Sequence, residues 1–196
     1  DTDDSLSVIR AIMNSLGISI QQFTPQSIRS RISNAKNQMI GWQQYEADAQ
    51  EIYEKQTALV YKEYDKRLKI NNAMDFDDIL LNMIKVLQLN PKIKAIYQKK
   101  FTFIMVDEYQ DTNHAQYMLI KELVGPDQGE IPPGQLCVVG DADQSIYAFR
   151  GANIQNILNF QKDYPDVKIF KLEQNYRSCE RILKAANILI ANNPHE

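Results

Sequence analysis

The chain has 196 residues, of which 22 are basic and 25 acidic, for a formal charge of −3. Hydrophobic residues make up 44% and charged residues 24%, which is typical of a globular domain and excludes a disordered or low-complexity chain. A weakly negative balance provides no general attraction for nucleic acid, so a site for nucleic acid has to be local. Two cysteines and two histidines are too few for a disulfide framework or a structural zinc site.

The sequence also gives an expectation for localisation. No apolar run approaches the roughly 18 residues that cross a membrane, and no signal peptide opens the chain. We therefore expect a cytoplasmic protein with no membrane partner. The chain begins at Asp1 rather than Met and ends in a polar run at 192–196, so we also expect it to be a piece of a longer protein.

The first half of the chain has the periodicity of helices. Apolar residues recur at helical spacing over residues 3–16, and a second helix is predicted from Pro25, because Pro is favoured at the first helical position. Gly and Pro are absent from residues 42–90. The pattern there predicts a long amphipathic helix as far as residue 68 and a shorter one over 76–87.

Residues from about 96 onward have the pattern of an α/β domain. Short apolar runs predict strands at 103–106, 136–139 and 167–170. Helical patterns lie between and after these runs, at 115–124, 154–160 and 182–190. This alternation predicts a parallel sheet with helices packed on it, and hence the α/β fold class.

Polar side chains follow each predicted strand. They are Asp107 and Glu108 after the first strand, Asp141, Asp143 and Gln144 after the second, and residues 173–177 after the third. In a parallel sheet, ligands bind at the carboxyl ends of the strands. One carboxylate there can hold Mg²⁺ and the next can activate a water molecule. Taken alone, however, acidic residues after a strand are more often caps.

Three longer strings carry a more specific signal. They are DEYQDTN at 107–113, GDADQSIYAFRGA at 140–152 and LEQNYRS at 172–178. In this order they resemble motifs II, III and IV of the UvrD/Rep/PcrA-type superfamily 1 DNA helicases. The helical stretch that contains DFDD at 75–78 resembles the helical subdomain inserted in the first motor domain of these enzymes. The resemblance covers nearly the whole chain.

The resemblance implies both a fold and an activity. The fold is an incomplete parallel RecA-like sheet of the P-loop NTPase type, with residues 1–22 and 96–196 in the first motor domain and residues 23–95 in the inserted all-helical subdomain. The activity implied for the parent protein is that of an ATP-driven translocase that unwinds duplex DNA, in the 3′ to 5′ direction, with Mg²⁺ as cofactor. The implied partners are ATP and single-stranded and duplex DNA.

The chain departs from the family pattern at one essential point. The phosphate-binding loop GxxxxGK[ST] requires a Lys after a Gly, and none of the seven glycines is followed by Lys. The glutamine motif that reads adenine is also absent, as are motifs V and VI. We therefore expect an internal fragment that lacks the Walker A region and the second motor domain and has no ATPase activity alone.

Several positions match family residues that handle ATP. Asp107 resembles the Mg²⁺-associated carboxylate, and Glu108 resembles the general base that activates the attacking water. Gln144 resembles the sensor of the γ-phosphate. Arg177 resembles a cationic γ-phosphate contact with the role of an arginine finger, and Tyr176 resembles the residue that stacks on adenine.

The second string also matches residues that line the single-strand DNA channel in the family, and these are Tyr147, Phe149 and Arg150. Many relatives have Trp in place of Phe149, and Phe keeps an aromatic face on which a base can stack. Packing is the alternative for Tyr147. Asp111 and Thr112 are equally well explained as caps of the following helix.

Other polar and aromatic residues have structural explanations of equal or greater weight. Asp141 and Asp143 are better explained as loop and cap residues than as ligands. Helix packing explains four tyrosines better than a stacking platform does, namely Tyr45, Tyr53, Tyr61 and Tyr64. A solvated helix face and contact with duplex phosphates are equally good explanations for three basic residues, Arg29, Arg31 and Lys36.

Three other functions are open from the sequence. The parent protein can be the helicase subunit of a helicase-nuclease. It can also be a helicase-like module that docks DNA or a partner after its ATPase has decayed, although Asp107, Glu108, Gln144 and Arg177 are intact. A purely helical interaction domain is disfavoured by the α/β half of the chain.

Overall fold

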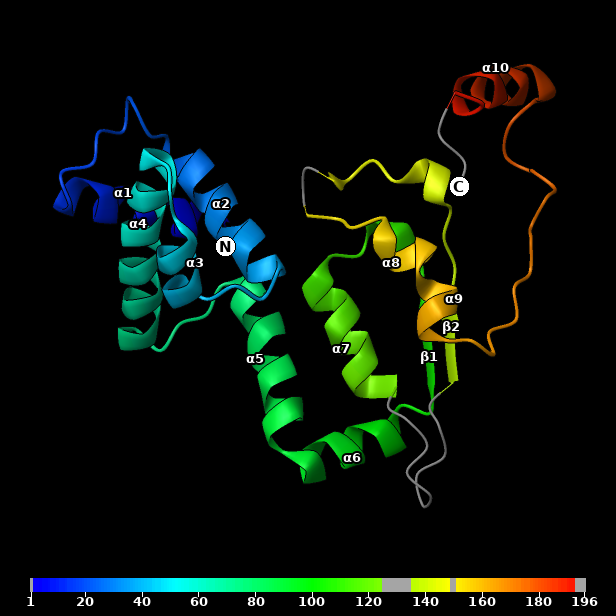
Figure 1. Ribbon diagram of the computed structural model, residues 1–196, viewed down its shortest axis with the longest axis horizontal. Helices are drawn as coiled ribbons and strands as arrows, with labels where there is room; N and C mark the ends of the chain where they lie inside the picture. The colour runs from blue at the N-terminus through cyan, green and yellow to red at the C-terminus, as the bar shows by residue number, and fades with distance from the viewer. Residues whose placement is uncertain (1, 125–134, 149–150, 193–196) are drawn as a thin grey trace.

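The computed structural model describes residues 2–124, 135–148 and 151–192. These residues form helices and one small sheet (Figure 1). The helices are α1 (Thr2–Ser15), α2 (Pro25–Asn37), α3 (Trp42–Asp48), α4 (Ile52–Ile70), α5 (Phe76–Leu89), α6 (Pro91–Lys100), α7 (His114–Val124), α8 (Gln155–Leu158), α9 (Phe160–Asp163) and α10 (Glu180–Ile190). The strands are β1 (Phe103–Val106) and β2 (Gln135–Val138), and they are followed by the short 3-10 helices η1 (Tyr109–Asp111) and η2 (Ala142–Gln144). No helix within the described ranges is long and apolar enough to span a bilayer.

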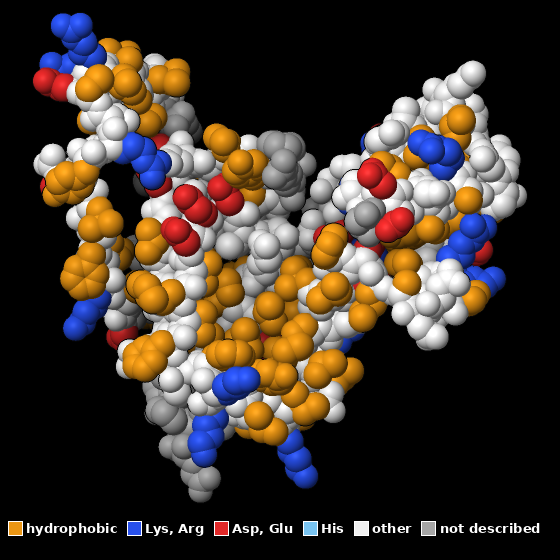
Figure 2. Space-filling view, turned by 180° about the vertical axis from the view of Figure 1, so that it is seen from behind, with side chains coloured by type: hydrophobic (Ala, Val, Ile, Leu, Met, Phe, Trp, Pro, Cys, Tyr) orange, Lys and Arg blue, Asp and Glu red, His pale blue; other side chains and the backbone are white. Residues whose placement is uncertain are grey.

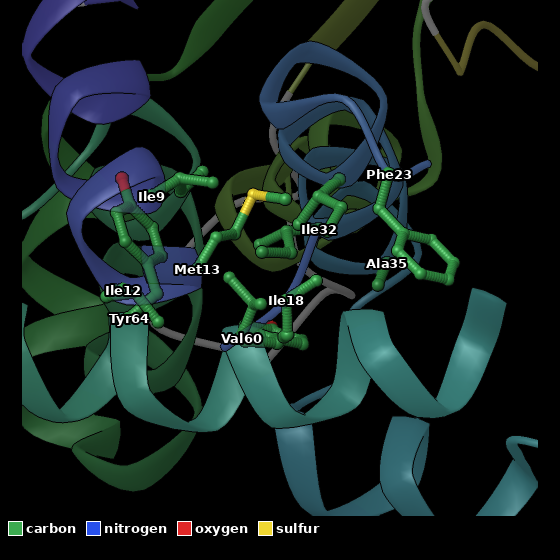
Figure 3. Close-up of a cluster of buried hydrophobic side chains, with 11 residues drawn as sticks. Ile9, Ile12, Met13, Ile18, Phe23, Ile32, Ala35, Val60 and Tyr64 are labelled. Atoms are coloured by element: carbon green, nitrogen blue, oxygen red, sulfur yellow. The ribbon is translucent and has the colours of Figure 1, made fainter. Parts of the chain in front are cut away.

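Helices α1, α2 and α4 share a hydrophobic core. Its residues recur three or four positions apart on each helix, the spacing that places side chains on one helical face. Figure 3 shows these side chains pointing toward one another between the helices. The cluster comprises Ile9, Ile12, Met13, Ile18, Phe23, Ile28, Ile32, Ala35, Val60, Tyr61 and Tyr64. Tyr45 and Tyr53 pack against it, so the prediction that the four tyrosines serve packing is confirmed.

The long helix predicted over residues 42–68 is wrong, because it is broken between α3 and α4. Ala49 has an extended backbone, with φ −67° and ψ 113°. The amides of Gln50 and Glu51 both donate to Glu54 Oε2, at 2.9 and 3.1 Å. The Glu54 carboxylate thus offers these two amides a partner outside a continuous helix, and it completes a capping box at the start of α4. These backbone hydrogen bonds lower the pKa of Glu54.

A buried ion pair joins α2 to the start of α5. Lys36 is 1% exposed, and its Nζ lies 2.8 Å from Asp75 Oδ2 and 2.7 Å from Asp78 Oδ1. Asp75 is also the N-cap of α5 and forms a reciprocal capping box with Asp78. Tyr64 Oη donates to Asp75 Oδ2 at 3.1 Å. Lys36 is therefore neither a phosphate contact nor part of a solvated face, and both explanations offered by its sequence position are wrong.

A second polar junction joins α5, α6 and α7. On α7, the Glu122 carboxylate accepts hydrogen bonds from Gln88 of α5 at 2.8 Å and from Lys94 of α6 at 2.6 Å. Gln98 of α6 donates to the Glu122 carbonyl at 2.8 Å. The sequence pattern did not predict α6. Its place between α5 and β1 is held by these contacts more than by an apolar stripe.

The sheet consists of β1 and β2 in parallel, with α7 in the connection between them (Figure 1). Phe103 is aligned with Gln135, and Val106 with Val138. The fold is therefore α/β in its coarse form, a mostly helical structure with a parallel sheet that has two strands in the described part of the chain. The strands predicted at 103–106 and 136–139 are confirmed to within one residue.

The third strand, predicted at 167–170, is wrong. Within the residues that the structure describes, this segment pairs with no strand, and Phe170 is 82% exposed. An apolar run becomes a strand only where a neighbour satisfies its backbone N–H and C=O groups. The segment instead forms part of the long irregular connection between α9 and α10 (Figure 1).

Candidate active site

The ends of β1 and β2 lie side by side and are joined by backbone hydrogen bonds. Val139 N donates to Val106 O at 2.8 Å, and Tyr109 N donates to Val139 O at 3.0 Å. The parallel register thus brings the segments that begin at Asp107 and Gly140 to the same edge of the sheet. This edge is where parallel sheets bind ligands.

Asp107 and Glu108 occupy a sharp turn directly after β1, and both side chains are exposed. Glu108 has a left-handed backbone, with φ 50° and ψ 44°, and its N–H donates to Asp107 Oδ1 at 2.9 Å. A left-handed conformation is uncommon for residues other than Gly and is found more often at functional sites. The turn directs the chain from the strand into η1.

Buried contacts hold the segment after this turn. Tyr109 is fully buried and packs edge-on against Phe160, with ring centroids 5.3 Å apart. Burial raises the pKa of Tyr109, which keeps its phenol neutral. Thr112 O accepts a hydrogen bond at 3.0 Å from the side chain of Asn156, which is also buried. The segment that follows Glu108 is therefore anchored against α8 and α9.

Gln110 connects the two strand ends through its side chain. Its Nε2 donates to Glu108 Oε2 at 2.8 Å, and its Oε1 accepts from Asp141 N at 3.1 Å. Gln110 is only 1% exposed. The sequence pattern did not predict a role for this residue. Its position two residues after Glu108 could have suggested a role at the site. The contact with Asp141, however, spans 31 residues and is not visible in a local pattern.

The loop after β2 is shaped by Asp141. This residue is the N-cap of η2, and its carboxylate accepts from Asp143 N at 3.0 Å and from Gln144 Nε2 at 2.7 Å. The prediction that Asp141 is a loop and cap residue is confirmed. The contact also orients Gln144, which remains exposed next to the strand ends.

The cap of α7 is Asn113, so the explanation of Asp111 and Thr112 as its caps is wrong. Asn113 Oδ1 accepts from Gln116 N at 2.9 Å, and Gln116 Oε1 accepts from Asn113 N at 3.0 Å. Thr112 instead donates from Oγ1 to Tyr109 O at 2.7 Å and supports η1. Asp111 Oδ1 is buried without a hydrogen-bond partner.

Tyr176 and Arg177 lie in the irregular connection between α9 and α10, where Tyr176 is 91% exposed. Asn175 Oδ1 accepts from the amides of Arg177 and Ser178, each at 2.9 Å, and shapes a local turn. Among the described residues, no hydrogen bond or ion pair links Arg177 to Glu108 or to the other predicted ATP-handling residues. The structure therefore does not bring this part of the predicted site together with the strand ends.

The described part of the loop predicted to meet DNA begins directly after η2, beside the sheet edge. Tyr147 is partly buried, and its carbonyl accepts from Ala152 N at 3.3 Å. Phe149 and Arg150 lie outside the described residues. At the far end of the loop, Gly151 has φ 84°, and a Cβ there would lie 3.7 Å from Asn37 Cβ. Gly151 thus lies close to the C-terminal end of α2.

Asp107 fits a Mg²⁺ site of the kind that is shared with a nucleotide. Its carboxylate is exposed at the strand end and uses Oδ1 to accept the Glu108 amide. Mg²⁺ prefers oxygen ligands and commonly takes one or two carboxylates together with phosphate and water. Among the residues that the structure describes, no three His, Cys, Asp or Glu side chains gather as a metal cage.

Comparisons with known proteins agree with the motifs at this site. The family model described as the UvrD/REP helicase N-terminal domain matches residues 1–165. The ATP-dependent DNA helicase UvrD1 of Mycobacterium tuberculosis is 50% identical over 197 residues, which cover 98% of this chain and 26% of that protein. The ATP-dependent DNA helicase PcrA of Bacillus subtilis is 48% identical over 193 residues, which cover 98% of this chain and 25% of that protein. The chain spans about a quarter of the length of these curated relatives, and it belongs to the UvrD/REP helicase family.

Proposed function

We propose that this chain is part of the first motor domain of an ATP-driven DNA translocase that unwinds duplex DNA, in the 3′ to 5′ direction. Residues 1–22 and 96–196 belong to the motor domain, and residues 23–95 form its helical subdomain. One observation carries the proposal: the exposed acidic pair after β1 and the loop with Gln144 after β2 share one sheet edge and are joined by hydrogen bonds. This arrangement supports a role for the edge in nucleotide hydrolysis and in the response to loss of the γ-phosphate.

Each residue at this edge has a distinct task in the proposed hydrolysis. Asp107 holds Mg²⁺, which when bound neutralises charge on the phosphates. Glu108 accepts a proton from the attacking water. Gln144 contacts the γ-phosphate. Arg177 and Tyr176 lie in the connection between α9 and α10 and not at this edge. In the proposed hydrolysis they approach it, so that Arg177 stabilises charge on the transferred phosphoryl group and Tyr176 stacks on adenine.

The exposed apolar surface supports the proposal that further chain completes this domain. Parallel sheets are normally covered on both faces. On β1, however, Phe103 is 72% exposed and Met105 is 78% exposed. Figure 2 shows hydrophobic side chains gathered across the lower centre of one face of the molecule. The relatives are about four times as long as this chain, so chain that could cover such a surface exists in them.

DNA binding is proposed for the loop that links the sheet edge to α2. Tyr147, Phe149 and Arg150 supply stacking surfaces and a cation for a single strand. The same loop begins at Gln144, beside the proposed γ-phosphate position, and ends at Gly151 against Asn37. A change at the nucleotide can therefore reach the DNA through one short segment.

The test uses the full-length protein and the variant Glu108→Gln. The amide keeps the shape of the side chain but cannot accept the proton, so we expect hydrolysis to slow by about 10²- to 10⁴-fold while ATP binding is retained. Glu46→Gln on α3 is the matched control and should keep the wild-type rate. Turnover of Glu108→Gln at the wild-type rate would show that Glu108 is not the base. The 196-residue chain alone should have no appreciable ATPase activity, because it contains no phosphate-binding loop.

A further inference from the structure

The buried amide of Gln110 needs an explanation, since the residues at both of its ends are exposed. Burying an amide costs free energy unless its N–H and C=O groups are hydrogen-bonded. Gln110 is 1% exposed and satisfies one group on each side, with Glu108 Oε2 at 2.8 Å and Asp141 N at 3.1 Å. The side chain therefore works as a bridge between two segments and not as a filler of space.

The chemistry of the two partners fixes how this amide is oriented. An ionised carboxylate only accepts hydrogen bonds, and a backbone N–H only donates them. Nε2 must therefore face Glu108 and Oε1 must face Asp141, because the reverse orientation would lose both bonds. The bridge requires a side chain that has a donor and an acceptor at its tip. Neither Glu nor Met meets this requirement.

Gly140 lies so close to Gln110 that a side chain at position 140 would crowd it. A Cβ at Gly140 would lie 2.7 Å from Gln110 Oε1 and 2.9 Å from Ile157 Cδ1. Both distances are shorter than real Cβ contacts. In addition, Ser145 Oγ donates to Gln110 O at 3.5 Å. Three separate positions in the loop after β2 thus accommodate Gln110, namely residues 140, 141 and 145.

The bridge extends to Gln144 through Asp141. Asp141 donates its amide to Gln110 and accepts the side chain of Gln144 at 2.7 Å. An unbroken series of contacts therefore links Glu108 with Gln144. We propose that Gln110 is a positioning residue, which aims the Glu108 carboxylate at the attacking water and ties it to the loop that carries Gln144. The inference rests on the proposed function, in which Glu108 is the base and Gln144 meets the γ-phosphate.

The first test replaces Gln110 with Met in the full-length protein. Met has a similar length but neither donates nor accepts a hydrogen bond of this kind, so the carboxylate of Glu108 is free to rotate. Since small displacements of a catalytic group cost up to about 100-fold in rate, we expect kcat for ATP to fall roughly 10- to 100-fold. KM for ATP should stay within about twofold, because Gln110 touches no nucleotide. A fall in kcat/KM that comes from a higher KM, with kcat unchanged, would overturn the inference.

The second test uses Gln110→Glu. This variant keeps an acceptor for Asp141 N but replaces the donor to Glu108 Oε2 with a carboxylate oxygen, which cannot donate to it. The Glu108 carboxylate should turn away from this oxygen, so we expect kcat for ATP to fall at least as far as in Gln110→Met, with KM again within about twofold. A wild-type kcat in Gln110→Glu would contradict the inference.

Controls separate this inference from the proposed function. Gln161→Met and Gln161→Glu change an exposed side chain on α9 and should leave kcat and KM for ATP as in wild type. If Glu108→Gln abolishes hydrolysis while both Gln110 variants behave as wild type, only the inference fails. If Glu108→Gln hydrolyses ATP normally, the proposed function fails. Loss of folding in both Gln110 variants, seen by circular dichroism, would assign Gln110 to the fold alone and overturn the inference.

Discussion

Lys94 Nζ lies 2.6 Å from Glu122 Oε2 and thereby joins α6 to α7. Glu122 also accepts a hydrogen bond from Gln88 of α5, so one carboxylate holds three helices together. Burial acts to raise the pKa of Glu122, but the hydrogen bonds from Lys94 and Gln88 outweigh it and hold the pKa below its ordinary value of 4.5. This junction connects the helical half of the chain with the sheet.

The stability that Glu122 provides should depend on pH. Its folded pKa is lower than its unfolded pKa, so the carboxylate stabilises the fold above about pH 4.5, and this contribution is lost as pH falls through the lower folded value. At pH 7, Glu122→Gln should lower the free energy of unfolding by about 1–2 kcal/mol. The difference from wild type should shrink as the pH falls from about 4.5 through the lower folded pKa. Urea unfolding of wild type and Glu122→Gln at pH 7 and at a pH below the folded pKa measures this difference. A difference that does not change with pH would contradict the expectation.

The buried ion pairs of Lys36 should stabilise the fold much more than an exposed ion pair does. Lys36→Met leaves Asp75 and Asp78 without their cation, and losing one partner of a buried pair typically costs about 3–5 kcal/mol. Lys69→Met is the control, because Lys69 pairs with Asp65 while 72% of its side chain is exposed. That change should cost less than about 1 kcal/mol. Urea unfolding of this chain compares the two, and similar losses would refute the expectation.

Gly140→Ala should disturb hydrolysis without touching a proposed catalytic side chain. The new methyl group would lie 2.7 Å from Gln110 Oε1 and so displace Gln110 from Glu108. We expect the full-length protein to lose roughly 10- to 100-fold in kcat for ATP. Gly41→Ala is the matched control, since its Cβ would meet only Gln43 Oε1 at 3.3 Å. A wild-type rate for Gly140→Ala would argue against the Gln110 bridge.

Tyr176→Ala should weaken the binding of ATP more than its hydrolysis. The ring is 91% exposed here and available to a planar base. Stacking of a base on an aromatic side chain is worth about 1–3 kcal/mol, so KM for ATP should rise roughly tenfold with kcat nearly unchanged. Tyr176→Phe keeps the ring and should keep KM. Steady-state kinetics of the full-length protein decide this, and an unaltered KM in Tyr176→Ala would rule out stacking on adenine.

Phe149→Ala should uncouple ATP hydrolysis from DNA. Loss of the aromatic face removes a stacking platform for a base, while the strand ends that we propose to handle ATP are unchanged. We expect the basal ATPase rate of the full-length protein to persist and its stimulation by single-stranded DNA to fall. Phe149→Trp restores a larger aromatic face and should retain stimulation. Full stimulation in Phe149→Ala would place the DNA path elsewhere.

Local patterns predicted most helices and both observed strands, because amphipathic spacing and short apolar runs are local properties. The break at Ala49 was missed, since its cause is the competition of the Glu54 carboxylate for backbone amides. The prediction of a third strand was wrong because a strand forms only beside a neighbouring strand, and composition alone does not provide one. Sequence placed Asp107 and Gln144 at strand ends correctly. It gave no indication of Gln110 as their link, because that contact depends on tertiary packing.

Asp75 and Asp78 each serve twice at the start of α5: they cap the helix reciprocally, and they neutralise Lys36. Nucleation of a helix is unfavourable in free energy, because the first turn fixes the backbone of several residues for a single hydrogen bond. Here the residues that ease nucleation also contact α2, 39 positions away in the sequence. The contacts that cap the first turn of α5 are therefore shared with its docking on α2. We expect the two helices to open together, and this opening would expose Lys36 to water.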